Sequence, residues 1–110
     1  MPELRLVYFK MRALAEAAQL VLAATDTPYT YEMAWDYFGE PWPEAKPKVP
    51  FRQLPMLVVD GDTKIAQSGA VVRYLAELTG LLPGSSKQRA EVDPIFEASQ
   101  EWFNPLNPTV

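Results

Sequence analysis

The chain has 110 residues, 48% of them hydrophobic and 12% aromatic, which suits one compact domain with a hydrophobic core. It contains no cysteine and no histidine, so disulfides, thiolate metal sites, a cysteine nucleophile and histidine-based catalysis are excluded. The net charge of −4 and the lack of a basic run argue against a nucleic-acid surface. No signal-peptide pattern or bilayer-length apolar stretch is present, so we expect a cytoplasmic protein without a membrane partner.

The first elements in chain order are a strand, a helix and a second strand. The short β-rich segment from Leu4 to Phe9 predicts the first strand. From Met11 the apolar residues recur at helical spacing, which predicts an amphipathic helix that ends before Thr25. Alternation from Tyr29 to Trp35 predicts the second strand, and this succession favours a parallel βαβ unit.

The sequence of the middle of the chain predicts a loop, a hairpin and a second helix. Residues 36–51 hold four prolines and one glycine, which predict an irregular loop with at most one helical turn. Two apolar runs flank Asp60-Gly61-Asp62, a strong hairpin signal. The next segment predicts a helix with Ser68 as N-cap and Gly80 as C-cap. The order β-α-β, loop, β-β-α is thioredoxin-like, and the predicted fold class is therefore α/β.

The sequence of the carboxy-terminal part predicts a linker and one more helix. Residues 81–88 have the composition of a linker. Asp93 and Pro94 could begin the helix as N-cap and first residue, and the sequence from Asn104 onward is not expected to continue it. The apolar face of this helix is opposed by an acidic stripe of Asp93, Glu97 and Glu101. A single amphipathic helix of this kind needs a partner for its apolar face.

Three stretches together resemble the N-terminal domain of cytosolic glutathione S-transferases. They are YFKMRALAE from Tyr8, PWPEAKPKVPFRQLPMLVVDGDTKIAQS from Pro41, and GAVVRYLAELTG from Gly69. No single motif is specific, but their order and spacing most resemble the classes that use a tyrosine, with sigma first and pi, mu and alpha behind. The resemblance implies a glutathione-binding domain over 1–80, a linker over 81–88 and the start of a truncated helical C-terminal domain over 89–110.

The resemblance gives Tyr8 a chemical role. In the family, a tyrosine at the end of the first strand donates a hydrogen bond to the glutathione sulfur. A thiol with a pKa of about 8.5 is only about 3% thiolate at pH 7, whereas a pKa of about 6.5 would ionise about three quarters of it. That shift corresponds to about 2.7 kcal/mol, which a donor and a nearby helix N-terminus can supply. The alternative is that Tyr8 is a core aromatic residue.

Further residues match glutathione-binding positions of the family. Gln67 and Ser68 would hold the γ-glutamyl carboxylate at a helix N-terminus, although Ser68 could simply cap that helix. Pro55 resembles the cis-proline that lets the preceding backbone pair with the cysteinyl unit, although X-Pro bonds are usually trans. The implied glutathione-binding set is Phe9, Trp42, Lys46, Gln53, Leu54, Pro55, Gln67, Ser68 and Glu101, with no metal.

Two departures qualify the resemblance. Leu14 stands where many relatives carry an arginine near the active site, and the chain stops one helix into the domain that forms most of the electrophile pocket. The predicted function is a glutathione transferase that activates the thiol through a tyrosine for attack on a small electrophile, with a sigma-like isomerase as a variant. The alternative is a non-catalytic binding or dimerisation module of the same fold. Missing cysteines exclude a thioredoxin-type oxidoreductase.

The resemblance also implies a partner chain. Phe51 occupies the place of an aromatic residue that inserts into a neighbouring subunit, and Glu101 matches an acid that reaches the partner's glutathione amine. We therefore expect a homodimer or a complex with a chain that supplies the missing helices. In the alternative, the last helix folds back on its own domain.

Overall fold

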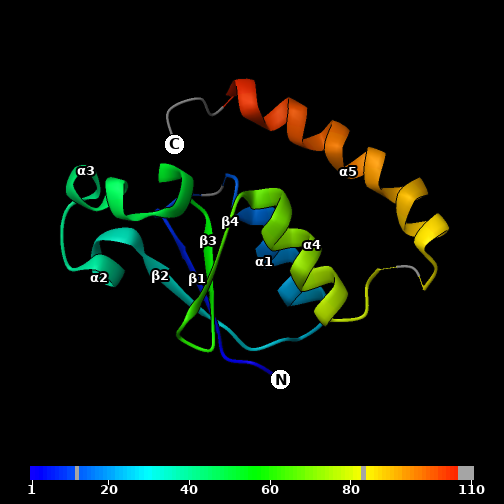
Figure 1. Ribbon diagram of the computed structural model, residues 1–110, viewed down its shortest axis with the longest axis horizontal. Coiled ribbons are helices and arrows are strands. Elements are labelled where there is room, and N and C mark those ends of the chain that lie inside the picture. Colours follow the sequence, from blue (N-terminus) through cyan, green and yellow to red (C-terminus); the bar gives the residue numbers. More distant parts are fainter. Residues whose placement is uncertain (12, 83, 107–110) are drawn as a thin grey trace.

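A computed structural model describes residues 1–11, 13–82 and 84–106, with side chains described as far as Gln100. The elements are β1 (Leu4–Tyr8), α1 (Glu16–Ala24), β2 (Thr30–Met33), α2 (Ala34–Phe38), α3 (Trp42–Ala45), β3 (Met56–Val59), β4 (Thr63–Ala66), α4 (Ser68–Leu78) and α5 (Ser86–Leu106) (Figure 1). Two 3₁₀ turns, η1 (Lys46–Lys48) and η2 (Pro50–Arg52), connect α3 to β3. No helix within the described ranges combines the length and apolarity needed to cross a membrane.

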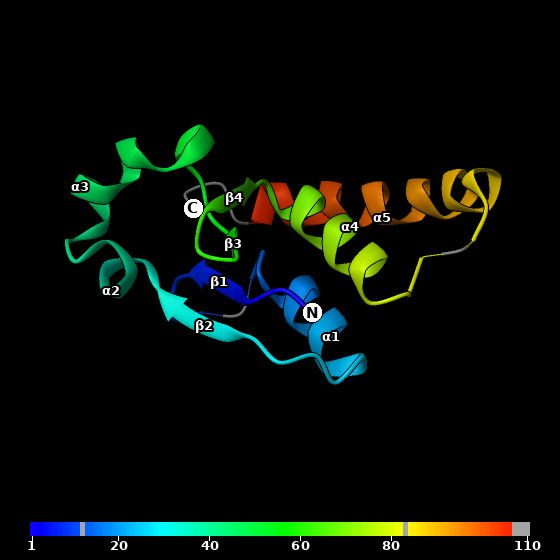
Figure 2. The same ribbon diagram turned by 60° about the horizontal axis from the view of Figure 1, so that its bottom comes forward.

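The four strands form one sheet in the order β2-β1-β3-β4. β1 is parallel to β2 and antiparallel to β3, and β3 is antiparallel to β4. Helices α1 and α4 pack together beside the sheet, while α2 and α3 lie on the opposite side of the molecule (Figures 1 and 2). This arrangement confirms the predicted thioredoxin-like α/β fold.

The core lies between the central strands and the α1–α4 layer. All four residues of β3 are buried, and Leu6, Val7, Leu22 and Leu75 have no exposed surface. Central strands covered on both faces read as continuous apolar runs instead of alternating ones, which explains the sequences of β1 and β3. The core therefore fixes β1 and β3, two of the strands whose ends carry the predicted site.

The first helix begins later than predicted, at Glu16 instead of near Met11. The preceding amides have tertiary partners: the Met11 N–H donates to the Phe9 carbonyl at 2.9 Å, and the Leu14 N–H donates to the Tyr8 hydroxyl at 3.1 Å. A turn that wraps around the end of β1 therefore replaces the first helical turn. Periodicity alone could not reveal these partners.

The predicted loop over 36–51 was too irregular, because most of it is helical. The second strand ends at Met33, so Trp35 belongs to α2 instead of to a strand. Pro43, Pro47 and Pro50 each fall in the first turn of a short helix. A proline there lacks an N–H that would have no intrahelical partner in any case, so these residues begin helices instead of preventing them.

The hairpin prediction is confirmed. Asp60 and Gly61 both have positive φ, 54° and 76°, and the Asp62 N–H donates to the Val59 carbonyl at 3.3 Å. Positive φ at both central positions is the signature of the type I′ turn that suits twisted strands. Asp60 is further fixed because its carboxylate accepts the Glu3 N–H at 2.9 Å.

Of the two predicted caps of α4, the serine at the start was wrong and the glycine at the end was confirmed. Ser68 is the first helical residue instead of the N-cap, which is Gln67 and makes no side-chain capping bond. At the other end Gly80 has φ 81°, and the Leu81 N–H donates to the Ala76 carbonyl at 2.9 Å. This is the glycine-centred helix end that the sequence predicts, one residue beyond the C-cap.

The last helix is longer than predicted at both ends. It starts at Ser86, inside the predicted linker, because Ser85 and Gln88 form a capping box: the Gln88 N–H donates to Ser85 Oγ at 3.1 Å, and the Ser85 N–H to Gln88 Oε1 at 3.3 Å. Pro94 lies in the interior of α5, so Asp93 is not an N-cap, and Asn104 continues the helix. The division into domains 1–80, 81–88 and 89–110 stays a prediction.

Candidate functional site

The strand register brings most predicted site residues to one end of the sheet. Val7 pairs with Met56, and Met56 pairs with Ala66. One position further on, the end of β1, the start of β3 and the end of β4 are adjacent, so Tyr8, Pro55 and Gln67 follow one another across three strands.

Tyr8 is fully buried, with no exposed surface. Its hydroxyl accepts the Leu14 N–H at 3.1 Å, which uses a lone pair of the oxygen and not its hydrogen. Leu14 thus contacts Tyr8 through its backbone amide, which any side chain at this position would leave in place. Burial and this bond fix the phenol at the point where β1 turns towards α1.

A second phenol lies beside the first. The Tyr31 hydroxyl, from β2, donates to the carbonyl of Phe9. Burial, and secondarily the neighbouring Tyr8, Tyr29 and Glu16, raise the pKa of Tyr31 above its ordinary value. Tyr31 is therefore a neutral donor that holds the residue after Tyr8 in place.

Aromatic contacts connect α3 to the end of β1. The centroid of the Phe9 ring lies 5.2 Å from that of the Tyr8 ring and 5.1 Å from that of the Trp42 ring. The planes of the Phe9 and Trp42 rings meet at 83°, which is an edge-on contact. Such pairs stabilise by about 0.5–1.5 kcal/mol beyond the area they bury. Trp42 is thus a packed aromatic that positions the helical segment containing Lys46, whose side chain is half-buried.

The start of β3 contributes mainly backbone. Leu54 and Pro55 are buried and the peptide bond between them is cis, as the resemblance implies. Gln53, just before them, is exposed. The Leu54 side chain faces the core, so only its backbone groups are suited to pair with an extended ligand.

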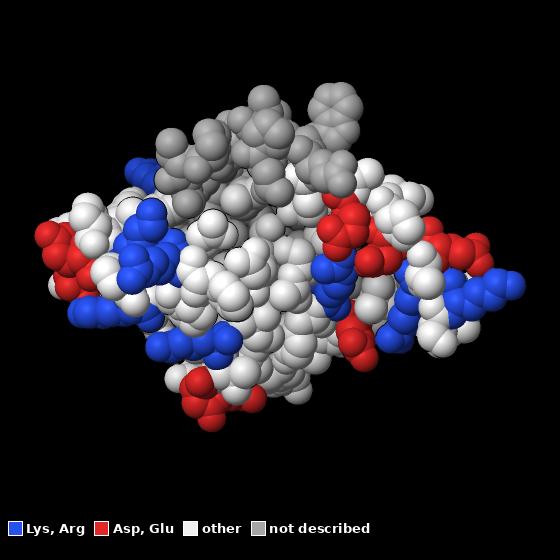
Figure 3. Space-filling model, turned by 45° about the horizontal axis from the view of Figure 1, so that its top comes forward, with Lys and Arg blue, Asp and Glu red and all other residues white. Residues whose placement is uncertain are grey.

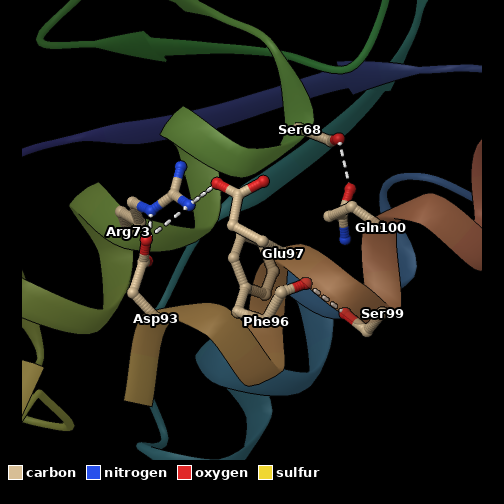
Figure 4. A network of polar contacts seen from close by, with 7 residues as sticks. All are labelled: Ser68, Arg73, Asp93, Phe96, Glu97, Ser99 and Gln100. Carbon is tan, nitrogen blue, oxygen red and sulfur yellow. Dashed lines mark hydrogen bonds and ion pairs between the residues drawn. The ribbon is translucent and has the colours of Figure 1, made fainter. Parts of the chain in front are cut away.

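A pocket of about 300 Å³ lies at the N-terminus of α4, lined by Gln67, Ser68, Gly69, Ala70, Arg73, Glu97 and Gln100. The first helical hydrogen bond runs from the Val71 N–H to the Gln67 carbonyl. The amides of the helical residues before Val71 therefore have no carbonyl partner within the helix. Such a helix start attracts anions. The Ser68 hydroxyl, predicted as a ligand, donates to Gln100 Oε1 at 2.9 Å (Figure 4).

Arg73 joins α4 to α5 beside this pocket. Its guanidinium donates to both Asp93 carboxylate oxygens, at 2.8 and 3.2 Å, and to Glu97 (Figure 4). It also lies over the Phe96 ring, 5.1 Å from the centroid. Hydrogen bonds to Asp93 and then Glu97 raise the pKa of Arg73 further above its ordinary value, so its charge is permanent.

Sequence reasoning missed Arg73, Glu97 and Gln100 as pocket residues. It placed Glu97 in an acidic stripe without a partner. The signal was present as spacing, because Asp93, Glu97 and Gln100 follow at intervals of four and three and so share one face of a helix. The predicted ligand Glu101 is on α5, but its side chain is outside the described part.

The surface charge is unevenly distributed. Figure 3 shows that side chains of both signs of charge gather at the two ends of this face, with uncharged residues between them. The sequence places Lys46, Lys48 and Arg52 on the two 3₁₀ turns, where Lys48 pairs with Glu40. Among the described residues, no group of three histidine, cysteine, aspartate or glutamate side chains could hold a metal ion.

Comparison with known proteins finds similarity to glutathione S-transferases and to a prostaglandin D synthase. Residues 4–77 match the family described as "Glutathione S-transferase, N-terminal domain". Glutathione S-transferase 1 of Ascaris suum is 38% identical over 108 residues, covering 98% of this chain and 50% of that protein. Hematopoietic prostaglandin D synthase of Homo sapiens is 35% identical over 106 residues, covering 94% of this chain and 50% of that protein.

A solved structure agrees. The crystal structure of the glutathione S-transferase from Ascaris lumbricoides matches with a TM-score of 0.83 and 36% identity, over 97% of this chain and 50% of that one. The chain therefore spans about half the length of the relatives it matches.

Proposed function

The chain belongs to the glutathione S-transferase family, and from that premise we propose that it binds glutathione and activates its thiol for attack on an electrophile. The observation that carries the proposal is the strand register, which gathers Tyr8, the Leu54–Pro55 bond and the Gln67–Ser68 helix start at one end of the sheet. These groups match three different parts of one tripeptide: its thiol, its backbone and its anionic amino-acid end.

Tyr8 is the proposed catalytic residue. Its hydroxyl accepts the Leu14 N–H, and donation of its own hydrogen to the sulfur is compatible with that bond because a hydroxyl can do both. A hydrogen bond to a charged atom contributes about 1.5–3 kcal/mol, enough to lower a thiol pKa by about one to two units. Tyr8 then acts as a neutral donor, and no base is required.

The γ-glutamyl end is proposed to lie in the pocket at α4. Its carboxylate would accept from the helix-start amides and from Ser68, which the helix dipole favours. The backbone of Leu54 would pair with the cysteinyl unit. Phe9, Gln53 and Pro55 would complete this strand-end surface, and Gln67 would border the carboxylate.

The glycyl carboxylate is proposed to lie near Trp42 and Lys46, on the segment that also carries Lys48 and Arg52. Trp42 is oriented by its edge-on contact with Phe9. Lys46 lies four residues further, one helical turn away, and its cationic head suits a carboxylate.

A homodimer, or a complex with a helical partner chain, is proposed as the assembly. Phe51 is 74% exposed and has φ 61°, so a large apolar ring is held outward by an unusual backbone conformation. Val92 and Ile95 on α5 are also exposed. Burial of these side chains against another chain would remove the exposed apolar surface, and Glu101 would then reach the partner's glutathione amine.

We propose a cytoplasmic location because the cosubstrate must be a reduced thiol, and the cytosol keeps glutathione reduced. The second candidate function is a non-catalytic module of the same fold. It is favoured by Leu14, which lacks the charge that an arginine would bring near the thiol.

Two experiments in sequence separate these functions. Calorimetric titration with glutathione tests binding, and a conjugation assay with an activated aryl halide then tests turnover. Turnover supports the transferase, and binding without turnover would support a glutathione-binding module. An absence of binding would contradict the transferase and leave the dimerisation module.

A further inference from the structure

We propose that Gln100 is a positioning residue whose side-chain amide sets the direction in which Ser68 donates its hydrogen, and thereby the affinity of the α4 pocket for a carboxylate. The proposal rests on the proposed function, in which the γ-glutamyl carboxylate binds there. Gln100 need not touch the ligand, because it acts through Ser68.

The contact between the two residues belongs to a set of side-chain bridges between two helices. Ser68 begins α4 and Gln100 lies on α5, 32 residues later, and their side-chain oxygens are 2.9 Å apart. Along the same face of α5, Asp93 and Glu97 bind Arg73, so Gln100 is held in line with them (Figure 4).

The bridging side chains also occupy space that Gly69 leaves open. A Cβ built on Gly69 would lie 3.2 Å from Arg73 Nη1 and 3.5 Å from the Phe96 ring. A residue without a side chain therefore stands where α5 approaches the first turn of α4. The Gln100 amide meets Ser68 on the same side of α5 as these contacts.

The polarity of this hydrogen bond conflicts with carboxylate binding. A serine hydroxyl has one hydrogen, and Ser68 gives it to Gln100 Oε1. A carboxylate can only accept, so it requires the same hydrogen. Rotation of the Gln100 amide by half a turn would present Nε2–H to Ser68 Oγ, which could then accept from Gln100 and donate to the ligand.

An amide is suited to this exchange because it carries both an acceptor and a donor. In the ligand-bound arrangement, amide, hydroxyl and carboxylate form a chain of hydrogen bonds in one direction, and such chains strengthen each member. A carboxylate in place of the amide would keep the serine hydrogen and add a negative charge beside the anion.

The test measures glutathione affinity by calorimetry in variants of the full chain. Gln100→Leu removes at similar volume the donor that orients the Ser68 hydrogen towards the ligand, and should weaken binding about threefold. Tighter binding, the result if Gln100 only competes for that hydrogen, would overturn the proposal. Gln100→Glu should weaken it more, by about a further tenfold at low salt, and should recover part of that loss at 1 M salt. Gln88→Leu removes a capping contact at the other end of α5 and should bind as the wild type does.

A double-mutant cycle with Ser68→Ala identifies the route of the effect. If Gln100 acts through Ser68, Gln100→Leu should have no further effect on affinity in the Ser68→Ala background. An equal loss in both backgrounds, or equal affinities of the Gln100→Leu and Gln100→Glu variants, would overturn the proposal.

The same data separate this proposal from the proposed function. Weaker binding in Ser68→Ala with wild-type affinity in both Gln100 variants would refute only the role of Gln100. Unchanged affinity in Ser68→Ala, or no glutathione binding by the wild type, would refute the carboxylate site itself and the role of Gln100 with it.

Discussion

Replacement of Arg73 by methionine should loosen α5 from α4 and leave the sheet folded. Methionine keeps an unbranched apolar stem and removes the guanidinium. The side chains of Arg73, Asp93 and Glu97 are 40%, 46% and 56% exposed, so each ion pair should contribute at most about 1 kcal/mol. The contact with Phe96 adds about 0.5–1 kcal/mol. We expect the whole attachment to lose about 1–2 kcal/mol.

Native-state hydrogen exchange measures this local effect. A loss of about 1–2 kcal/mol should reduce the protection of α5 amides about 5-fold to 30-fold, while β3 amides keep theirs. The matched control is Lys87→Met, which also replaces a cation of α5 by methionine, because Lys87 is exposed and forms no ion pair with the other described residues. Equal protection of α5 in the two variants would refute the role of Arg73, and an equal loss in β3 and α5 would refute the idea that α5 opens separately.

Three further predictions follow from the site and its surface. Ser68→Ala should weaken glutathione binding by about 1–3 kcal/mol with little change in unfolding midpoint, since Ser68 does not cap α4; calorimetry and thermal unfolding check both. The pKa of Tyr31 is raised in the folded chain, which means that the fold favours the neutral phenol. The stability that the neutral phenol contributes is therefore complete below the pKa of the unfolded chain, about 10, and is lost as the pH rises through the pKa of the folded chain. Urea unfolding between pH 9 and 11 should therefore show a smaller loss of stability in Tyr31→Phe than in the wild type. Phe51→Asp should reduce self-association in sedimentation at micromolar concentration, whereas a wild-type chain that is folded and monomeric would contradict the proposed dimer.

The sequence predicted the fold because its main signals are local. The apolar runs of β1 and β3, the Asp60-Gly61 turn and the glycine after α4 each determine their own structure, and their order permits one familiar topology. Tyr8 and Ser68 could be proposed as site residues because Tyr8 ends the first strand and Ser68 begins a helix, at positions to which the resemblance assigns ligand contacts.

The failures concern structure that depends on distant partners. The start of α1 was misplaced because Tyr8, six residues earlier, accepts the Leu14 amide. The role of Gln100 was missed because its partner lies 32 residues away in sequence. The start of α5 is different: the Ser85–Gln88 capping box is a local signal, and it was overlooked because the composition around it suggested a linker.

The most direct test of the central claim, that the Tyr8 hydroxyl stabilises the thiolate, is an ultraviolet titration of bound glutathione in wild type and Tyr8→Phe. The substitution removes one oxygen and also leaves the Leu14 N–H without its acceptor, so unfolding should be measured alongside, with an expected loss of about 1–2 kcal/mol. We expect glutathione affinity to change only a few fold and the pKa of the bound thiol to rise by about one to two units, the equivalent of a hydrogen bond to a charged sulfur. An unchanged thiol pKa in a folded Tyr8→Phe variant that still binds glutathione would contradict the claim.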